Sequence, residues 1–191
     1  LAALNHPNIV SILTAEKIDG TFFIVMEYVK GESLEGLLDR EKIVDQFKAV
    51  EMAVQILKGV EHAHKAQILH RDLRPANVLV SEGGVLKVAD FGTSRILDRA
   101  HANTVIGSPP YMAPDANEDH RSDLYSLGCV LFETLSGTPP FTGSSQNEYF
   151  HHHISTPPDL AKLPPEARSV VGWLLQKDPK LRFPDLGAFR L

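Results

Sequence analysis

Residues 70–77 read His70-Arg71-Asp72-Leu73-Arg74-Pro75-Ala76-Asn77, and residues 90–92 read Asp90-Phe91-Gly92. Between them, the β-prone runs 78–80 and 85–88 flank a Gly83-Gly84 pair. A two-residue loop at that pair suits a type I′ or II′ hairpin, which places Asn77 opposite Asp90. If the turn instead takes residues 81–84, the register slips and this pairing is lost.

This hairpin predicts a cluster of oxygen ligands at one end. The Asn77 amide oxygen and the Asp90 carboxylate suit Mg²⁺, a hard cation that keeps substrate phosphates in its remaining positions. Asp72 lies five residues before Asn77 (77 − 72 = 5), on the loop that leads to the same end. A carboxylate there can accept a proton from a hydroxyl that attacks a metal-bound phosphate.

The motif spacing carries a family resemblance. HRDLRPAN is followed by DFG thirteen residues after Asn77 (90 − 77 = 13) and then by GSPPYMAPD at residues 107–115. This order resembles the catalytic domain of eukaryotic-type (Hanks-type) serine/threonine protein kinases. The alternative is a hairpin with ordinary polar turns. The resemblance implies Asp72 as the base, Asn77 and Asp90 as Mg²⁺ ligands, and Leu79 as an apolar floor under adenine.

Other positions follow from the same resemblance. Arg74 and Ser108 join Asp72 and Asn77 as catalytic residues, and His70 and Phe91 become packing residues that hold the loop. Residues 9–15 and 21–29 read as strands joined at Asp19-Gly20. In the kinase comparison the second strand enters the hinge, where Met26 is the gatekeeper and the Glu27 carbonyl and Val29 amide bond the base. A core strand is the alternative, and both can hold.

Residues 93–107 resemble the activation segment. The comparison places an activating phosphate on Thr104 and gives Arg71 and Arg95 the role of receiving it. The alternative is that Thr104 is a solvated loop residue and that both arginines pair with local acids such as Asp98. The Gly-Ser before Tyr111, together with a basic residue two after Asp72, is the serine/threonine pattern.

Three helices are predicted from periodicity. Residues 46–66 place Phe47, Val50, Val54, Leu57 and Val60 on one stripe, and residues 167–175 form a last amphipathic helix. Residues 123–135 are apolar all round and therefore buried. In the family comparison this is the central helix, with Asp123 anchoring the catalytic loop and Arg182 pairing with Asp115. A metal site at residues 151–153 is disfavoured, because three consecutive histidines cannot share one face.

Composition excludes several classes. At 191 residues and 43% hydrophobic content, the chain can bury one substantial core. A net charge of −5 gives no basic footprint for nucleic acid. Cys129 is the only cysteine, which fits a reducing cytoplasmic setting, and no stretch of about 18 apolar residues is present. A membrane anchor in a longer parent chain would not be visible here.

The predicted boundaries are 1–29 for the end of the N-lobe with the hinge and 30–191 for the C-lobe. The Gly-rich loop, the strand-three Lys and most of helix C are missing, so the first residue reads as a cut. Three departures from the family stand out: Arg74 replaces the usual Lys, Asp115 replaces the usual Glu, and only eight positions separate Asp115 from Asp123 (123 − 115 = 8).

The sequence therefore predicts an α+β, protein kinase-like fold, mainly the helical C-lobe with residual N-lobe strands. The expected function is transfer of the ATP γ-phosphoryl group to Ser or Thr hydroxyls of proteins, with Mg²⁺, in a bacterial-like and cytoplasmic enzyme. ATP and a protein substrate are the expected partners, with no nucleic acid and no membrane segment in this chain. This chain alone is expected to be nearly inactive. The alternative is a pseudokinase-like binding or scaffold module with degenerate catalysis.

Overall fold

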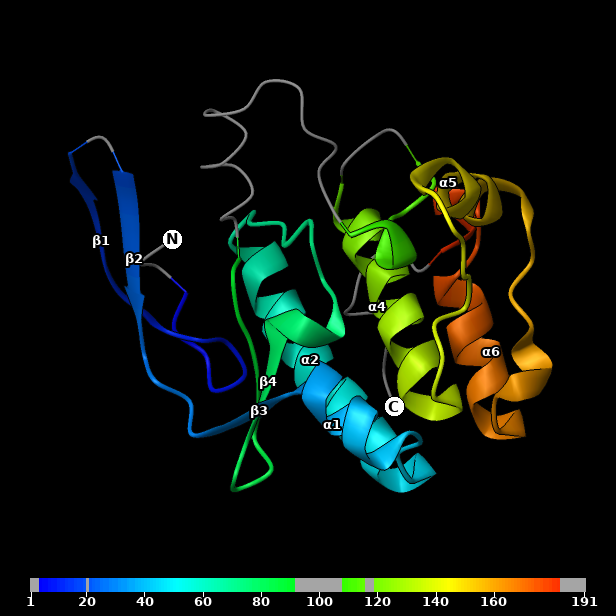
Figure 1. Ribbon diagram of the computed structural model, residues 1–191, viewed down its shortest axis with the longest axis horizontal. Helices are drawn as coiled ribbons and strands as arrows, with labels where there is room; N and C mark the ends of the chain where they lie inside the picture. Colours follow the sequence, from blue (N-terminus) through cyan, green and yellow to red (C-terminus); the bar gives the residue numbers. More distant parts are fainter. Residues whose placement is uncertain (1–3, 20, 92–107, 116–118, 183–191) are drawn as a thin grey trace.

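The computed structural model describes residues 4–19, 21–91, 108–115 and 119–182. A two-stranded hairpin lies on one side, and a body of helices around a small three-stranded sheet lies on the other (Figure 1). The strands are β1 (Ile12–Ile18), β2 (Thr21–Met26), β3 (Gly31–Ser33), β4 (Val78–Ser81) and β5 (Leu86–Val88). The helices are α1 (Leu34–Glu41), α2 (Gln46–Lys65), α4 (His120–Ser136), α5 (Gln146–Ser155) and α6 (Pro165–Leu174), with 3₁₀ turns at Pro75–Asn77, Pro109–Tyr111, Leu160–Lys162 and Pro179–Leu181. The predicted α+β class is confirmed.

The β1–β2 hairpin turns where the sequence predicts. Ile18 pairs with Thr21, which agrees with the predicted turn position, and Asp19 has the positive φ of 48° that two-residue loops require. The first strand begins at Ile12 and not at the predicted Ile9. The reason is a second partner, because Val10 N donates to Val88 O at 2.9 Å and Val88 N donates to Asn8 O at 2.9 Å. Residues 8–10 therefore pair with β5.

The predicted register of the β4–β5 hairpin is wrong by one residue. Val78 pairs with Val88, and Ala89 N donates to Asn77 O at 2.8 Å, so Asn77 lies opposite Ala89 and not Asp90. The loop contains three residues: Gly84 N donates to Ser81 O at 2.9 Å, and Gly84 itself has φ of 78°. A single left-handed glycine completes this kind of loop, whereas a type I′ loop needs two positive φ values.

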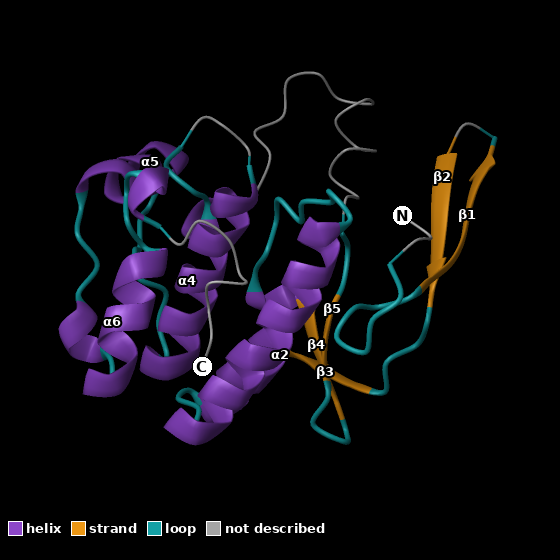
Figure 2. Ribbon diagram, turned by 180° about the vertical axis from the view of Figure 1, so that it is seen from behind, coloured by secondary structure: helices purple, strands orange, loops and turns teal. Residues whose placement is uncertain are grey.

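Helix α2 forms over the predicted range, but its buried face differs from the prediction. Phe47 is 80% exposed and Val50 is 42% exposed. The buried face instead consists of Ala49, Met52, Ala53, Ile56, Leu57, Gly59, Val60 and Ala63. Small residues on this face allow close approach: a Cβ on Gly59 would lie 2.6 Å from Asn8 O. Figure 2 shows α2 lying against the three-stranded sheet.

Helix α4 is the centre of the body, as its all-round apolar pattern predicts. Leu124, Leu127, Val130 and Phe132 are each 0% exposed. Asp119 caps its start by accepting from Arg121 N at 2.7 Å, and Gly137 ends it with the left-handed φ of 78°. The helix packs against α2 on one side and α6 on the other. It is therefore a rigid support for loops that dock on it.

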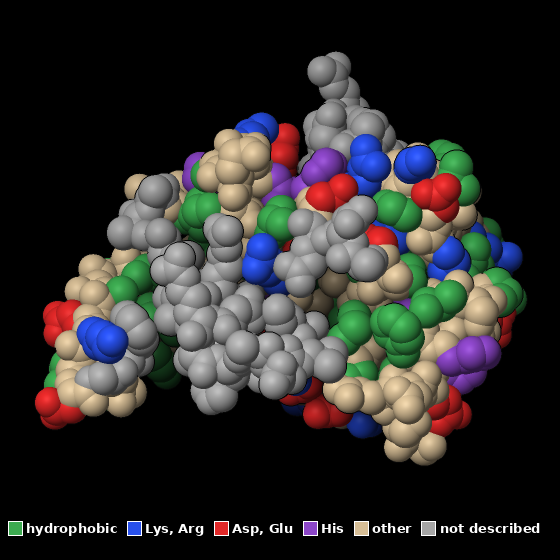
Figure 3. Space-filling view, turned by 90° about the horizontal axis from the view of Figure 1, so that it is seen from above, with side chains coloured by type: hydrophobic (Ala, Val, Ile, Leu, Met, Phe, Trp, Pro, Cys, Tyr) green, Lys and Arg blue, Asp and Glu red, His purple; other side chains and the backbone are tan. Residues whose placement is uncertain are grey.

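The described part of the chain holds no helix that is both long and apolar enough to span a bilayer. Within the same ranges, no group of three or more His, Cys, Asp or Glu side chains is arranged to hold a metal ion. The predicted Mg²⁺ ligands Asn77 and Asp90 are an amide and a carboxylate, so they are not a group of that kind. Acidic and basic side chains are interspersed on the face seen in Figure 3.

Candidate functional site

The Asp123 side chain binds the backbone of the loop at residues 70–77. Its two carboxylate oxygens accept from His70 N and Arg71 N, each at 2.8 Å, and its Oδ2 also lies 2.7 Å from His64 Nε2. Burial alone would raise the pKa of this carboxyl, but the bonds from His64 and the His70 backbone hold the pKa below its usual value. Asp123 therefore stays ionised. Arg71 has a left-handed φ of 71°, which costs energy for a non-glycine residue.

His70 connects this loop to the strand end that carries Asp90. Its Nε2 lies 2.8 Å from Ala89 O, and its Nδ1 accepts from Asp72 N at 3.2 Å. Because a carbonyl only accepts and an N–H only donates, the ring is neutral with its proton on Nε2. Burial lowers the pKa of His70, which agrees with that state. The ring meets Phe91 edge-on, with centroids 4.7 Å apart.

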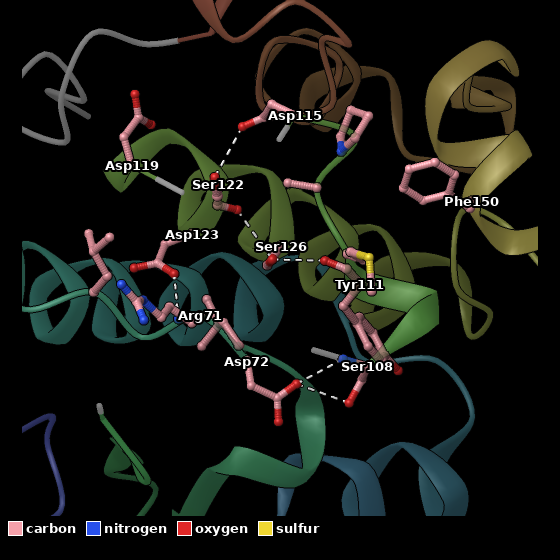
Figure 4. Close-up of a pocket in the computed structure, with 15 residues that line it drawn as sticks. Arg71, Asp72, Ser108, Tyr111, Asp115, Asp119, Ser122, Asp123, Ser126 and Phe150 are labelled. Atoms are coloured by element: carbon pink, nitrogen blue, oxygen red, sulfur yellow. Dashed lines mark hydrogen bonds between the residues drawn. The ribbon is translucent and has the colours of Figure 1, made fainter. Parts of the chain in front are cut away.

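The Asp72 carboxylate is fixed from two sides. Its Oδ1 accepts from both the N–H and the hydroxyl of Ser108, each at 3.0 Å (Figure 4). Its Oδ2 lies 3.2 Å from Asn77 Nδ2, which also donates to Asp72 O at 2.8 Å. Both Asn77 bonds use the amide nitrogen, so the amide oxygen is oriented away from Asp72. That orientation suits a hard cation on the other side.

Arg74 joins the same cluster. One terminal nitrogen donates to the Ser108 hydroxyl at 3.0 Å, and the other lies 3.3 Å from the Glu35 carboxylate on α1. The sequence-predicted residues Asp72, Arg74, Asn77 and Ser108 thus lie within one connected network. Asp90 follows Ala89 at the end of β5 and has φ of 63°, so the chain turns sharply where this side chain leaves the hairpin.

A cavity of about 250 Å³ opens beside this network. Figure 4 shows Arg71, Asp72 and Ser108 on one wall and Asp119, Ser122 and Phe150 among the residues around it. Acidic and apolar side chains are mixed in the lining. Asp72 is one of the residues that line this cavity.

Residues 1–185 match the family model described as protein kinase domain. The chain belongs to the protein kinase domain family.

Several relatives agree with this assignment. The kinase domain is 36% identical to a probable serine/threonine-protein kinase of Clostridium perfringens, over 96% of this chain and 28% of the relative. It is 36% identical to the probable serine/threonine-protein kinase PknB of Bifidobacterium longum, over all of this chain and 31% of the relative. It is 38% identical to the serine/threonine-protein kinase PknB of Mycobacterium tuberculosis, over 95% of this chain and 32% of the relative. The chain thus spans about three tenths of these curated relatives.

A solved structure shares the fold. Rad53 residues 1–466 in complex with AMP-PNP superimposes with a TM-score of 0.83 and 28% sequence identity. The match covers 98% of this chain and 50% of the Rad53 chain.

The ion pair predicted between Asp115 and Arg182 is present. Arg182, which is 3% exposed, pairs with Asp115 and also donates to Gln176 O at 2.8 Å and Arg121 O at 2.9 Å. Asp115 in turn accepts from the Ser122 hydroxyl at 3.0 Å. The shorter acid therefore still reaches its partner.

The residues predicted to form the hinge, Glu27 and Val29, lie in the segment between β2 and β3. Glu27 N donates to Ser11 O at 2.9 Å, and its carboxylate accepts from Lys87 Nζ at 2.8 Å. Met26 is 37% exposed at the end of β2. Val29 and Leu79 are half-buried, Leu79 on β4. The positions of these four residues do not test whether they contact adenine, so the adenine contacts stay predictions.

Thr104 and Arg95 lie outside the described residues. Of the three residues predicted to form the phosphate pocket, the structure describes Arg71 alone. The sequence interpretation missed His64, whose partner Asp123 lies 59 positions away in the chain. It also missed Glu133, which accepts from Tyr111 OH at 2.7 Å and whose pKa is raised by burial. A polar residue interrupting a buried helix is the one signal that points to Glu133.

Proposed function

We propose that this kinase domain transfers the γ-phosphoryl group of ATP to serine or threonine hydroxyls of proteins. The observation that carries the proposal is the Asp72 carboxylate, held on one oxygen by both donors of Ser108 and approached on the other by Asn77. The names of the relatives and the AMP-PNP in the Rad53 structure support it. ATP and Mg²⁺ as cofactors are part of the same proposal.

The residues divide the chemistry between them. Asp72 orients the substrate hydroxyl and accepts its proton as the oxygen attacks. Arg74 sets a positive charge beside Ser108, where it can stabilise negative charge on the transferred group. Asn77 and Asp90 would hold Mg²⁺, and the amide orientation described above fits an oxygen-preferring ion. When bound, Mg²⁺ neutralises phosphate charge. Protein substrates and a cytoplasmic location complete the proposal.

The scaffold alternative rests on Asp115 and on the short segment before α4. The Asp115–Arg182 pair supports the enzyme over the scaffold, since the substitution has kept its contact. A scaffold also has no requirement for an Asp72 carboxylate held by three donor atoms.

Replacing Asp72 with asparagine in the full-length protein tests the function. We expect turnover to fall by at least about 10²-fold, because the proton acceptor is lost, while ATP affinity changes little. Asp39→Asn, an exposed acid on α1, is the matched control and should leave turnover unchanged. Initial rates of phosphate transfer and equilibrium nucleotide binding are compared for all three proteins. Unchanged turnover in Asp72→Asn would falsify the assignment.

We further propose that Thr104 carries an activating phosphate received by Arg71 and Arg95. Two guanidinium groups that meet one dianion form strong charge-assisted bonds. Thr104→Ala should lower activity, and adding Arg71→Ala should lower it little further, because both changes break one contact. Phosphosite mapping that finds Thr104 unmodified in fully active protein contradicts the proposal.

A further inference from the structure

A chain of hydrogen bonds runs from Lys177, which follows α6, to the turn beside Asp72. His153 on α5 is 1% exposed, and its Nε2 lies 2.9 Å from Pro109 O. Its Nδ1 lies 2.9 Å from Tyr125 OH on α4, and that hydroxyl lies 3.3 Å from Lys177 Nζ. Both ring nitrogens are engaged, so His153 has no nitrogen left for a metal ion.

The direction of each bond is determined by its ends. A carbonyl only accepts, so His153 Nε2–H donates to Pro109 O. An ammonium group only donates, so Tyr125 oxygen accepts from Lys177 and its own proton goes to His153 Nδ1. The ring is therefore neutral in one tautomer. Burial and the nearby Lys177 charge lower the pKa of His153 to about 4, which keeps the ring neutral at pH 7.

Aromatic contacts fix the orientation of the ring. The Phe141 ring meets His153 edge-on at 4.9 Å between centroids, and the Tyr125 ring meets it at 5.6 Å. Edge-on packing on two sides leaves the imidazole little freedom to rotate. The Nε2–H bond to Pro109 is thus directed by the core of the domain.

Pro109 is the point where this chain reaches the site. It directly follows Ser108, whose N–H and hydroxyl hold Asp72, and it begins the 3₁₀ turn Pro109–Tyr111. Proline has no N–H, so its carbonyl is its only polar backbone group. Figure 4 shows the Ser108–Tyr111 turn between Asp72 and the helix that carries Phe150. A shift of Pro109 therefore moves Ser108, and with it the carboxylate.

We propose that His153 is a positioning residue for phosphoryl transfer: through Pro109 it holds Ser108 against Asp72. The inference rests on the proposed function for its kinetic meaning, but the structural coupling can be measured without activity. If His153 only fills space in the core, an apolar side chain of similar size will serve equally well.

Four variants of the full-length protein separate these two roles. His153→Leu keeps the volume but removes both bonds. His153→Gln supplies an amide N–H and an amide oxygen that can replace Nε2–H and Nδ1. His151→Gln, on the exposed side of the same helix, is the matched control. Tyr125→Phe, which keeps the ring, is a milder change in case His153→Leu does not fold.

We expect His153→Leu to lower kcat by about tenfold, the effect of roughly one lost hydrogen bond on a fixed geometry, with little change in the KM for ATP. Amide hydrogen exchange at Ser108, Tyr111 and Met112, the residues of this turn that have an N–H, should accelerate in His153→Leu, accelerate less in Tyr125→Phe, and stay near wild type in His153→Gln. His151→Gln should match wild type in both measurements.

Exchange at residues 108–112 that is unchanged in both His153→Leu and Tyr125→Phe overturns the proposal, whatever the rates show. So does a His153→Leu enzyme with wild-type kcat. If wild type itself transfers no phosphate, the proposed function fails, and the exchange pattern still decides the coupling of His153 to the turn.

Discussion

Arg71 shows how a single residue sets the shape of the catalytic loop. Its left-handed φ of 71° is of the kind that costs about 1–3 kcal/mol in a residue with a side chain. The Asp123 carboxylate offsets this strain by accepting hydrogen bonds from His70 N and Arg71 N. Charged acceptors make hydrogen bonds worth roughly 1.5–3 kcal/mol each, so the clamp exceeds the strain. His64 then orients the carboxylate.

His153 links stability to pH. Its pKa is about 4 in the folded state against an ordinary 6.5, with Lys177, Tyr125 and His152 as the titratable groups around it. Because the folded pKa is depressed, the unfolded chain takes up the proton first as pH falls. The stability that neutral His153 contributes is therefore present above pH 6.5 and is lost as pH falls toward 4.

The prediction is a difference between two proteins. From pH 7 to pH 4, the free energy of unfolding of wild type should fall by about 3 kcal/mol more than that of His153→Gln, whose side chain does not titrate. Urea denaturation at stepped pH measures this. Parallel curves for the two proteins contradict the assignment of the neutral, buried ring.

At the scale of elements, α2 depends on close approach at Gly59. Alanine would gain up to about 1 kcal/mol of helix propensity there. Its Cβ would, however, lie 2.6 Å from Asn8 O, a backbone atom already engaged with Val88. Overpacking typically costs about 1–3 kcal/mol, so Gly59→Ala should be destabilising.

Gly36→Ala on α1 is the matched control. A Cβ at Gly36 has its nearest neighbour at 3.4 Å, an ordinary contact with the flexible Glu32 side chain. This variant should therefore be neutral or stabilised by up to about 1 kcal/mol. Thermal or urea unfolding measures both variants. A Gly59→Ala protein as stable as Gly36→Ala shows that the Asn8 segment can move away from α2 without loss.

Most elements could be predicted from the sequence, and the exceptions have physical causes. Periodicity placed α2 and α4 because their apolar residues recur along the chain. It misjudged the buried face of α2, because alanine and glycine form much of that face and carry little hydrophobic signal. The hairpin register was wrong because Gly83-Gly84 suits two loop lengths, and only the fold selects the three-residue loop.

The residues of the candidate site also differ in whether the sequence alone could indicate them. Asp72, Asn77 and Asp90 could be proposed from the sequence because they lie close together in the chain, within two adjacent motifs. His64 and His153 could not, since each acts on a residue more than forty positions away: 59 positions for His64 and Asp123, and 44 for His153 and Pro109. Contacts of that separation were predicted only where the family resemblance supplies them, as for Asp115 and Arg182, which lie 67 positions apart.

At the scale of the whole molecule, residues 1–191 contain no Gly-rich run of the kind that covers ATP phosphates in protein kinases. Losing one preorganised electrostatic contact costs on the order of 10²-fold in rate. The purified 191-residue chain should therefore bind ATP weakly and phosphorylate itself at a rate at least about 10²-fold below that of the full-length protein. Isothermal titration with Mg-ATP and radiolabel incorporation measure the two effects. Autophosphorylation at the rate of the full-length protein contradicts this expectation.

The pairing of residues 8–10 with β5 has a mechanical consequence. Val10 and Asn8 are bound to Val88 by two backbone hydrogen bonds of 2.9 Å, and Glu27 is bound to Lys87 at 2.8 Å. A pulling force applied to the β1–β2 hairpin is therefore transmitted to β5 through these bonds. β5 ends two residues before Asp90. Tension on the β1–β2 hairpin would therefore act on the proposed metal-binding end of the site.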